Sequence, residues 1–164
     1  YSYEGVPDIR VIVFRGVPVM AMIRCATHSS DGKANLHQGA VGVGIDMGTG
    51  QSICAVQHNR IVTQHPDTHI SFDKLTIPYW QPLLELASGC AGMAGLDYLG
   101  VDIVLDRLRG PMLLELNARP GLAIQVANQA GLKHRLQLAA EIADDTNNVD
   151  EKIALARRHF TAQA

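Results

Sequence analysis

The chain has 164 residues, of which 47% are hydrophobic and 18% charged, and its formal net charge at pH 7 is −2. This composition is typical of one globular domain, and the weak negative charge argues against a nucleic-acid-binding surface. No hydrophobic run approaches the roughly 20 residues of a membrane span, and we expect no signal peptide. Three scattered cysteines without a CxxC pair are typical of reduced thiols, so we expect a cytoplasmic protein.

The first predicted elements are two strands, at 8–14 and 17–23, which a tight turn joins into a hairpin. Arg10 and Arg24 lie among the hydrophobic residues of this hairpin. Two interpretations stay open for each arginine. It is either an edge residue that faces solvent or a contact for a bound anion.

The polar segment at 26–38 is longer than most loops that lack internal structure, and loops of this length are often functional. We predict a mobile flap over an active site, with Lys33 and His37 as weaker candidates for substrate contact. A histidine in such a loop is more commonly just solvated.

A third pair of strands is predicted at 40–47 and 52–58. Gly39, Gly42 and Gly44 alternate with other residues, chiefly valine, in the first of these strands. The alternation favours a strand that another backbone approaches closely over a phosphate-binding loop.

Residues 59–76 are predicted to form a loop, in which a His-Pro-Asp-Thr-His cluster is interpreted as a solvated turn and a metal site is the alternative. Helices are predicted at 82–95 and 122–130, the second of them short. Two more are expected in the last third of the chain, on hydrophobic residues at helical spacing. Asn148 and Glu151 are predicted to form a capping box at the start of the last helix.

Residues 99–121 are the most informative stretch, because two alternating runs around a turn predict a hairpin. A symmetric turn pairs Val104 with Leu113 and places Asp102 opposite Glu115. Like charges in directly opposed positions destabilise a strand pair. We therefore expect a positive group between the two carboxylates.

Asp102, Glu115 and the amide oxygen of Asn117 are hard oxygen ligands that suit Mg²⁺ held together with phosphate oxygens. The alternative is an exposed hairpin face that happens to be acidic. Residues 117–121 then leave the strand in a tight turn, which would bring backbone N–H groups and Arg119 to an anion.

These runs resemble a known family. Gly-Val-Asp-Ile at 100–103 and Glu-Leu-Asn-Ala-Arg-Pro-Gly at 115–121 resemble the C-terminal metal hairpin of ATP-grasp ligases, most of all RimK-like α-L-glutamate ligases and related proteins. Asp-Ile-Arg at 8–10, Arg24 and Asn-Leu-His-Gln-Gly at 35–39 are similar to the same family. The resemblance implies three sets of residues: metal ligands Asp102, Glu115 and Asn117; cofactor contacts Arg10, Asn35, Glu115 and Asn117; and catalytic groups Arg10, Arg24 and Arg119.

The fold that the resemblance implies is α+β, the C-terminal lobe of an ATP-grasp enzyme, with an antiparallel sheet of about six strands packed with helices. We expect residues 1–164 to be one domain, with a core at 8–130 and C-terminal helices at 131–164. We also expect it to be the C-terminal fragment of a longer enzyme whose N-terminal ATP-grasp portion is missing.

The function that the resemblance implies is ATP- and Mg²⁺-dependent ligation of a carboxylate to an amine through an acyl phosphate, with release of ADP. Two metal ions are expected, with Mn²⁺ as an alternative. The substrates would be small-molecule or peptide carboxylates and amines, with glutamate or a similar amino acid as the group added. The alternative is a non-catalytic nucleotide-binding or assembly module, and a homo-oligomer stays open. No nucleic-acid or membrane partner is expected.

Overall fold

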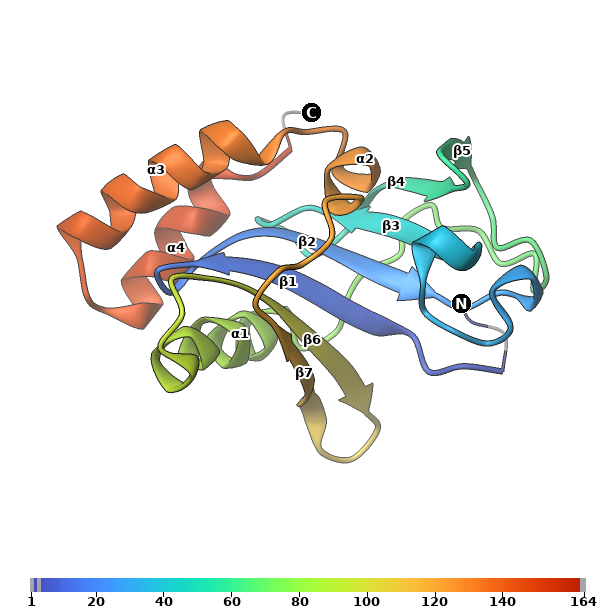
Figure 1. Ribbon diagram of the computed structural model, residues 1–164, viewed down its shortest axis with the longest axis horizontal. Coiled ribbons are helices and arrows are strands. Elements are labelled where there is room, and N and C mark those ends of the chain that lie inside the picture. The colour runs from blue at the N-terminus through green and yellow to red at the C-terminus, as the bar shows by residue number, and fades with distance from the viewer. Residues whose placement is uncertain (1, 3, 163–164) are drawn as a thin grey trace.

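The computed structural model describes residue 2 and residues 4–162, and it is built on one antiparallel sheet (Figure 1). Within the described residues the sheet has seven strands in the order β5-β4-β3-β2-β1-β6-β7. Their bounds in chain order are β1 Asp8–Phe14, β2 Val17–Cys25, β3 Val41–Ile45, β4 Ser52–Gln57, β5 Arg60–Val62, β6 Tyr98–Asp106 and β7 Gly110–Asn117. The α+β class and the antiparallel sheet are therefore confirmed.

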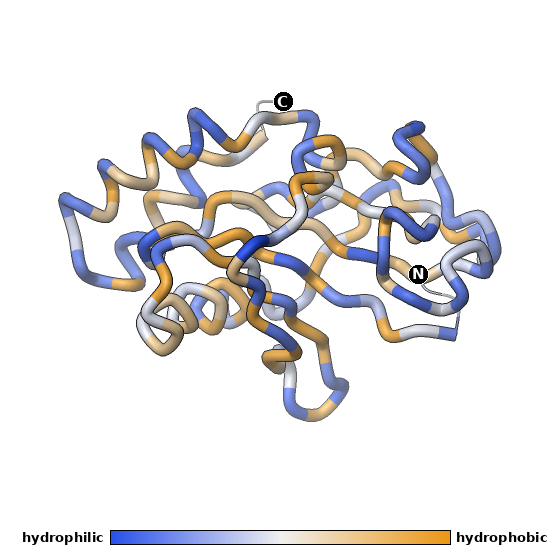
Figure 2. The backbone as a smooth tube through the Cα atoms, in the orientation of Figure 1, coloured by the Kyte–Doolittle hydropathy of each residue, from blue (hydrophilic) through white to orange (hydrophobic). Residues whose placement is uncertain are grey.

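Four α-helices accompany the sheet in the described part of the chain: α1 Trp80–Ala94, α2 Ile124–Asn128, α3 Leu132–Asp145 and α4 Val149–His159. In Figure 1, α1 packs behind strands β1, β2, β6 and β7, whereas the segment from β7 to α2 crosses in front of them. Helices α3 and α4 pack on β2 at one end of the sheet. Hydrophobic residues are concentrated in the central strands (Figure 2), and their buried side chains form the core with those of the helices.

The predicted glycine-rich strand is confirmed as β3. A Cβ atom on Gly44 would overlap the backbone carbonyl of Ala127 in α2, and one on Gly42 would lie 2.7 Å from the side chain of Leu36. These glycines thus let α2 and a neighbouring turn lie directly on the sheet, as close backbone approach requires.

The predicted loop at 59–76 is wrong in two respects. It contains the three-residue edge strand β5, and its His65 is fully buried instead of solvated. His65 Nδ1 accepts hydrogen bonds from the backbone N–H groups of Asp67 and Thr68, both 3.2 Å away. Nε2 must then carry the proton and donate to the carbonyl of Ala26 at 2.9 Å. Both ring nitrogens are engaged, so His65 joins this segment to the end of β2.

The predicted capping box of α4 is half right. The Asn148 side chain accepts from the Glu151 backbone N–H at 3.1 Å, as predicted. The Glu151 carboxylate does not return the bond, because the Asn148 N–H donates to the Thr146 Oγ1 at 3.1 Å, and that hydroxyl in turn donates to Glu151 at 2.6 Å. The segment predicted as a flap contains two short 3₁₀ turns, His28–Ser30 and Leu36–Gln38.

Among the described residues, no helix is long and apolar enough to cross a bilayer. The three cysteines are free thiols, and two of them, Cys25 and Cys90, are buried in the core.

Candidate functional site

Strands β1, β2 and β6 place four charged side chains side by side on one face of the sheet. Asp8 lies opposite Arg24 in the β1–β2 pair, and Arg10 lies opposite Asp102 in the β1–β6 pair. Residues two apart on a strand share a face, and so do directly opposed residues. The face is the one that α2 covers further along, because Arg24 is paired with Gly42 of β3.

The four side chains form one hydrogen-bonded network. Arg10 donates to both oxygens of Asp102, from Nε at 2.7 Å and from Nη2 at 2.6 Å. Arg24 donates in the same bidentate way to Asp8, with both distances 2.6 Å, and also from Nη2 to Asp102 Oδ2 at 2.7 Å. Bidentate pairs of this kind are the strongest of the side-chain hydrogen bonds.

Burial makes this network important to the fold. The side chain of Asp102 is 1% exposed, and those of Arg10 and Arg24 are each 12% exposed. The interpretation of these arginines as solvent-facing edge residues is therefore wrong, since both lie on central strands against carboxylates. The arginines place positive charge beside Asp102. Among the described residues none of them pairs with Glu115, so the positive group expected between the two carboxylates stays a prediction.

The pKa values of the Asp8–Arg24 pair reflect burial and pairing together. Burial raises the pKa of Asp8 above its ordinary value, and the hydrogen bond from Arg24 opposes that shift without cancelling it. Burial lowers the pKa of Arg24, but the carboxylates of Asp8 and Asp102 more than offset it and raise the pKa overall. Arg24 is therefore firmly cationic.

The β6–β7 hairpin pairs the two acids as predicted, but the register of the strands differs from the predicted one. Asp102 is opposite Glu115, but Val104 is opposite Met112 and not the predicted Leu113. Asp106 lies opposite Gly110, so the hairpin closes with a three-residue loop, one residue shorter than the predicted turn at 107–110, and a register shift between Asp102 and Ile103 compensates. The predicted Val104 pairing is wrong, whereas the pairing of the two acids is confirmed.

The three predicted metal ligands lie near one another but differ in their availability. Asn117 donates from Nδ2 to Asp102 Oδ2 at 3.1 Å, so the Asp102 carboxylate accepts from two arginines and an amide. Glu115 is exposed and has no ion-pair partner among the described residues. In that same part of the chain, no group of three or more His, Cys, Asp or Glu side chains is arranged to hold a metal ion.

A pocket of about 350 Å³ opens beside the network. It brings together five of the predicted residues, and it excludes Asp102 and Glu115. The five are Arg10, Arg24, Asn35, Asn117 and Arg119, and the weaker candidate His37 also lines the pocket.

Arg119 is the free cation of this pocket. It is exposed, and it makes no hydrogen bond or ion pair with any described residue. The following Pro120 is buried against β6, where a Cβ atom on Gly100 would lie 2.7 Å from that of Pro120. This contact fixes the turn and holds Arg119 at the edge of the pocket.

Asn35 has a structural task that the sequence did not indicate, because its side-chain oxygen accepts from the His37 N–H at 3.0 Å and begins a 3₁₀ turn. Asp8 is the member of the network that sequence reasoning missed. Its position opposite Arg24 could have drawn attention to it, but a register shift between Ile12 and Val13 intervenes.

Three arginines line one pocket of this antiparallel α+β lobe, and guanidinium groups have the chemistry that suits an anion. The sequence is more specific about the class. The chain belongs to the sugar-transfer associated ATP-grasp family, which it matches over residues 1–141. The ATP-grasp expectation is thereby confirmed. The narrower RimK-like resemblance stays a prediction.

Two similar solved structures are of the ATP-grasp ligase PsnB, one complexed with a minimal precursor and one with a phosphomimetic variant of it, Mg and ADP. They are 16% and 15% identical to this chain over 91% and 92% of its length, each with a TM-score of 0.44. The chain spans only 34% and 33% of those two chains. No relative among curated proteins matches it.

Proposed function

We propose that this chain is the C-terminal lobe of an ATP-dependent ligase that joins a carboxylate to an amine. The observation that carries the proposal is the pocket itself, in which the unpaired Arg119 faces the same space as Arg10 and Arg24 in a chain of the ATP-grasp family. Such a pocket suits an acyl group and a phosphoryl group, both anionic.

The proposed reaction has two steps. A carboxylate oxygen of one substrate attacks the γ-phosphorus of ATP, the bond to the β-phosphate oxygen breaks, and ADP leaves. The amine then attacks the acyl carbon, loses a proton, and inorganic phosphate leaves. Phosphoryl transfer depends mainly on positioning and charge stabilisation, so no side-chain nucleophile is needed.

Arg119 would bind the carboxylate or the transferred phosphoryl group. Its whole guanidinium group is available, whereas Arg10 and Arg24 each donate from Nε and Nη2 to carboxylate oxygens. Among the described residues their Nη1 groups make no hydrogen bond, so each keeps one nitrogen for the pocket. Asn35 would add a neutral amide contact.

A magnesium ion, which would neutralise phosphate oxygens, fits only part of the predicted ligand set. Asp102 already accepts from Arg10, Arg24 and Asn117, so it does not suit the ion in this arrangement. The Glu115 carboxylate and the side-chain amide oxygen of Asn117 are the groups that would hold the ion. We propose Mg²⁺ or Mn²⁺ dependence on these residues, with two ions as the expected number.

The first prediction tests the chemistry. The complete enzyme, given ATP, a carboxylic acid and hydroxylamine, should form a hydroxamate and release ADP. Arg119→Met should lower the hydroxamate rate about 10²-fold, which is typical of losing one charge-stabilising donor. Because Arg119 has no partner, the change leaves no group unpaired. Arg109→Met, in the exposed β6–β7 loop, is the matched control and should retain full activity. Release of AMP, or ATP consumption that needs no carboxylic acid, would exclude this mechanism.

The second prediction concerns the metal. Glu115→Ala should weaken Mg²⁺-nucleotide binding in the complete protein more than Asp106→Ala does. Asp106 is a suitable comparison because its carboxylate caps the hairpin turn, accepting from the N–H groups of Leu108 and Arg109. Titration of Mg²⁺ against each variant measures the difference. Equal affinities would remove Glu115 from the ligand set.

The engagement of Arg10 and Arg24 by buried carboxylates favours a second candidate function, a non-catalytic nucleotide-binding or assembly module. The hydroxylamine experiment separates the two. Tight nucleotide binding with no hydroxamate from any acid tested would support the module. The identity of the acid and the amine, glutamate included, is part of the ligase proposal and would follow from the acids that react.

A further inference from the structure

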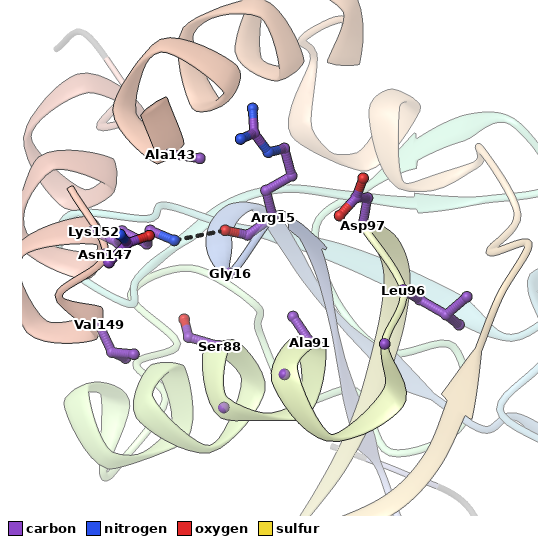
Figure 3. Close-up of a pocket in the computed structure, with 13 residues that line it drawn as sticks. Arg15, Gly16, Ser88, Ala91, Leu96, Asp97, Ala143, Asn147, Val149 and Lys152 are labelled. Atoms are coloured by element: carbon purple, nitrogen blue, oxygen red, sulfur yellow. Dashed lines mark hydrogen bonds between the residues drawn. The ribbon is translucent and has the colours of Figure 1, made fainter. Parts of the chain in front are cut away.

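A second pocket, of about 480 Å³, lies at the far end of β1 from the candidate site (Figure 3). It is bounded by the Arg15–Gly16 turn, by one face of α1 and by the junction of α3 and α4. Arg15, directly after β1, lies five positions beyond Arg10, which is roughly 16 Å at the usual rise per strand residue. The two pockets have no lining residue in common.

The hydroxyl of Ser88 lacks a hydrogen-bond partner in this pocket. The residue is 3% exposed, and its Oγ makes no hydrogen bond with any described residue. Figure 3 shows the hydroxyl directed toward the contact between Lys152 and Arg15. A buried polar group without a partner costs free energy, so its presence calls for a reason.

Lys152 lines the same pocket and is also buried, with an exposed fraction of 9%. Its Nζ donates to the backbone carbonyl of Arg15 at 2.9 Å, and no Asp or Glu among the described residues forms an ion pair with it. An ammonium group has three donors. Lys152 therefore has two further N–H donors available and a charge that no described carboxylate compensates through an ion pair.

The remaining charges around the pocket limit the charge of its occupant. The Arg15 guanidinium is already paired with Asp144 at 2.7 Å, and the exposed Asp97 adds a negative charge at the rim. One free cation beside a spare hydroxyl suits a monoanion better than a doubly charged phosphate.

The wall formed by α1 leaves room for a small apolar group. Cβ atoms on Gly89, Gly92 or Gly95 would meet nothing within 4 Å. Leu96 and Val149 contribute apolar surface to the same pocket. The space is therefore open, with a polar end at Ser88 and Lys152 and a smooth apolar wall.

We propose that this pocket binds the carboxylate of a small aliphatic acid, with Lys152 Nζ and Ser88 Oγ as the donors. Binding would satisfy the Ser88 hydroxyl and compensate the Lys152 charge in one step. The site is separate from the pocket proposed for ligation, and it stands whether or not that proposal holds.

The test is a titration of the ¹⁵N-labelled full chain with sodium butyrate at constant ionic strength, followed by NMR. We expect saturable shifts of the amide resonances of Gly16, Gly89 and Gly92, and none of comparable size at Arg119. Inorganic phosphate should bind more weakly than butyrate. The absence of saturable shifts, or tighter binding of phosphate, would overturn the proposal.

Variants identify the donors. Ser88→Ala should weaken butyrate binding about tenfold, yet it should leave the free protein as stable or more stable, because it removes an unpaired hydroxyl. Lys152→Met should abolish saturation, whereas Lys133→Met, at an exposed position of α3, should leave it unchanged. Gly92→Leu fills the pocket without touching either donor and should block butyrate in a folded protein. Unchanged affinity in Ser88→Ala and Gly92→Leu would place butyrate elsewhere and refute the assignment.

Discussion

At the scale of single residues, Asp102 determines the state of the candidate site. Its carboxylate compensates Arg10 and Arg24 at once, although the three residues come from three strands. Removing one member of a buried ion network leaves the others charged and unpaired, and that loss exceeds the net contribution of the intact network.

We therefore predict that Asp102→Ala lowers the free energy of unfolding by about 3–5 kcal/mol. Urea denaturation of the variant and the parent protein measures the change. Asp106→Ala is the control on the same hairpin, because Asp106 is exposed and contacts only the backbone of its own turn. Asp106→Ala should lower the free energy of unfolding distinctly less than Asp102→Ala does. Similar losses in both variants would mean that the network contributes no more than an ordinary turn.

At the scale of elements, most strands and helices follow from pattern, but their register does not. The paired strands β1 and β2 and the helices α1, α3 and α4 follow from alternation and from helical spacing. Strand β5 does not follow from the sequence, because it has only three residues and two of them are exposed. Three residues are too few for an alternating pattern that would distinguish a strand from a loop.

Register shifts explain what sequence reasoning could not give for the site. A shift between Ile12 and Val13 sets Asp8 opposite Arg24, and another beside Asp102 sets the acid pair of the β6–β7 hairpin. A shift of one residue moves every side chain beyond it to a new partner. Residue types thus indicated the participants, but only the three-dimensional structure showed that the arginines bind carboxylates.

The close contact between α2 and β3 gives a prediction at this scale. Gly44→Ala should destabilise the protein by roughly 1–3 kcal/mol, since its Cβ would overlap the Ala127 carbonyl and backbone cannot move away cheaply. Gly89→Ala is the matched substitution in open space and should stabilise α1 by about 0.5–1 kcal/mol. Thermal unfolding compares the two. A neutral Gly44→Ala would show that α2 is not tightly seated.

At the scale of the whole molecule, α4 ties distant parts of the chain together. Arg157 donates from Nε and Nη2 to the Gly48 carbonyl, at 3.1 and 2.8 Å, and from Nη1 to the Gln81 side chain at 2.9 Å. One side chain thus links the last helix to the turn after β3 and to the start of α1.

We predict that Arg157→Met lowers the free energy of unfolding by roughly 1–3 kcal/mol, because the Gly48 carbonyl loses its donors. Arg158→Met, at the exposed neighbouring position of the same helix, should change stability little. Differential scanning calorimetry of both variants provides the comparison. If the two melting temperatures fall equally, the loss reflects helix charge and not the link.

The buried network also bears on how the chain reaches its final strand order. Arg24 pairs with Asp8 within the first hairpin, 16 residues away in the sequence. The partner of Arg10 is Asp102, 92 residues further along the chain, so this pair forms only when β6 docks on β1. A β6 strand misaligned by one residue would turn Asp102 to the opposite face and leave Arg10 uncompensated. The network therefore favours the native register of β6 over a register shifted by one residue, since only the native register pairs each of these charges.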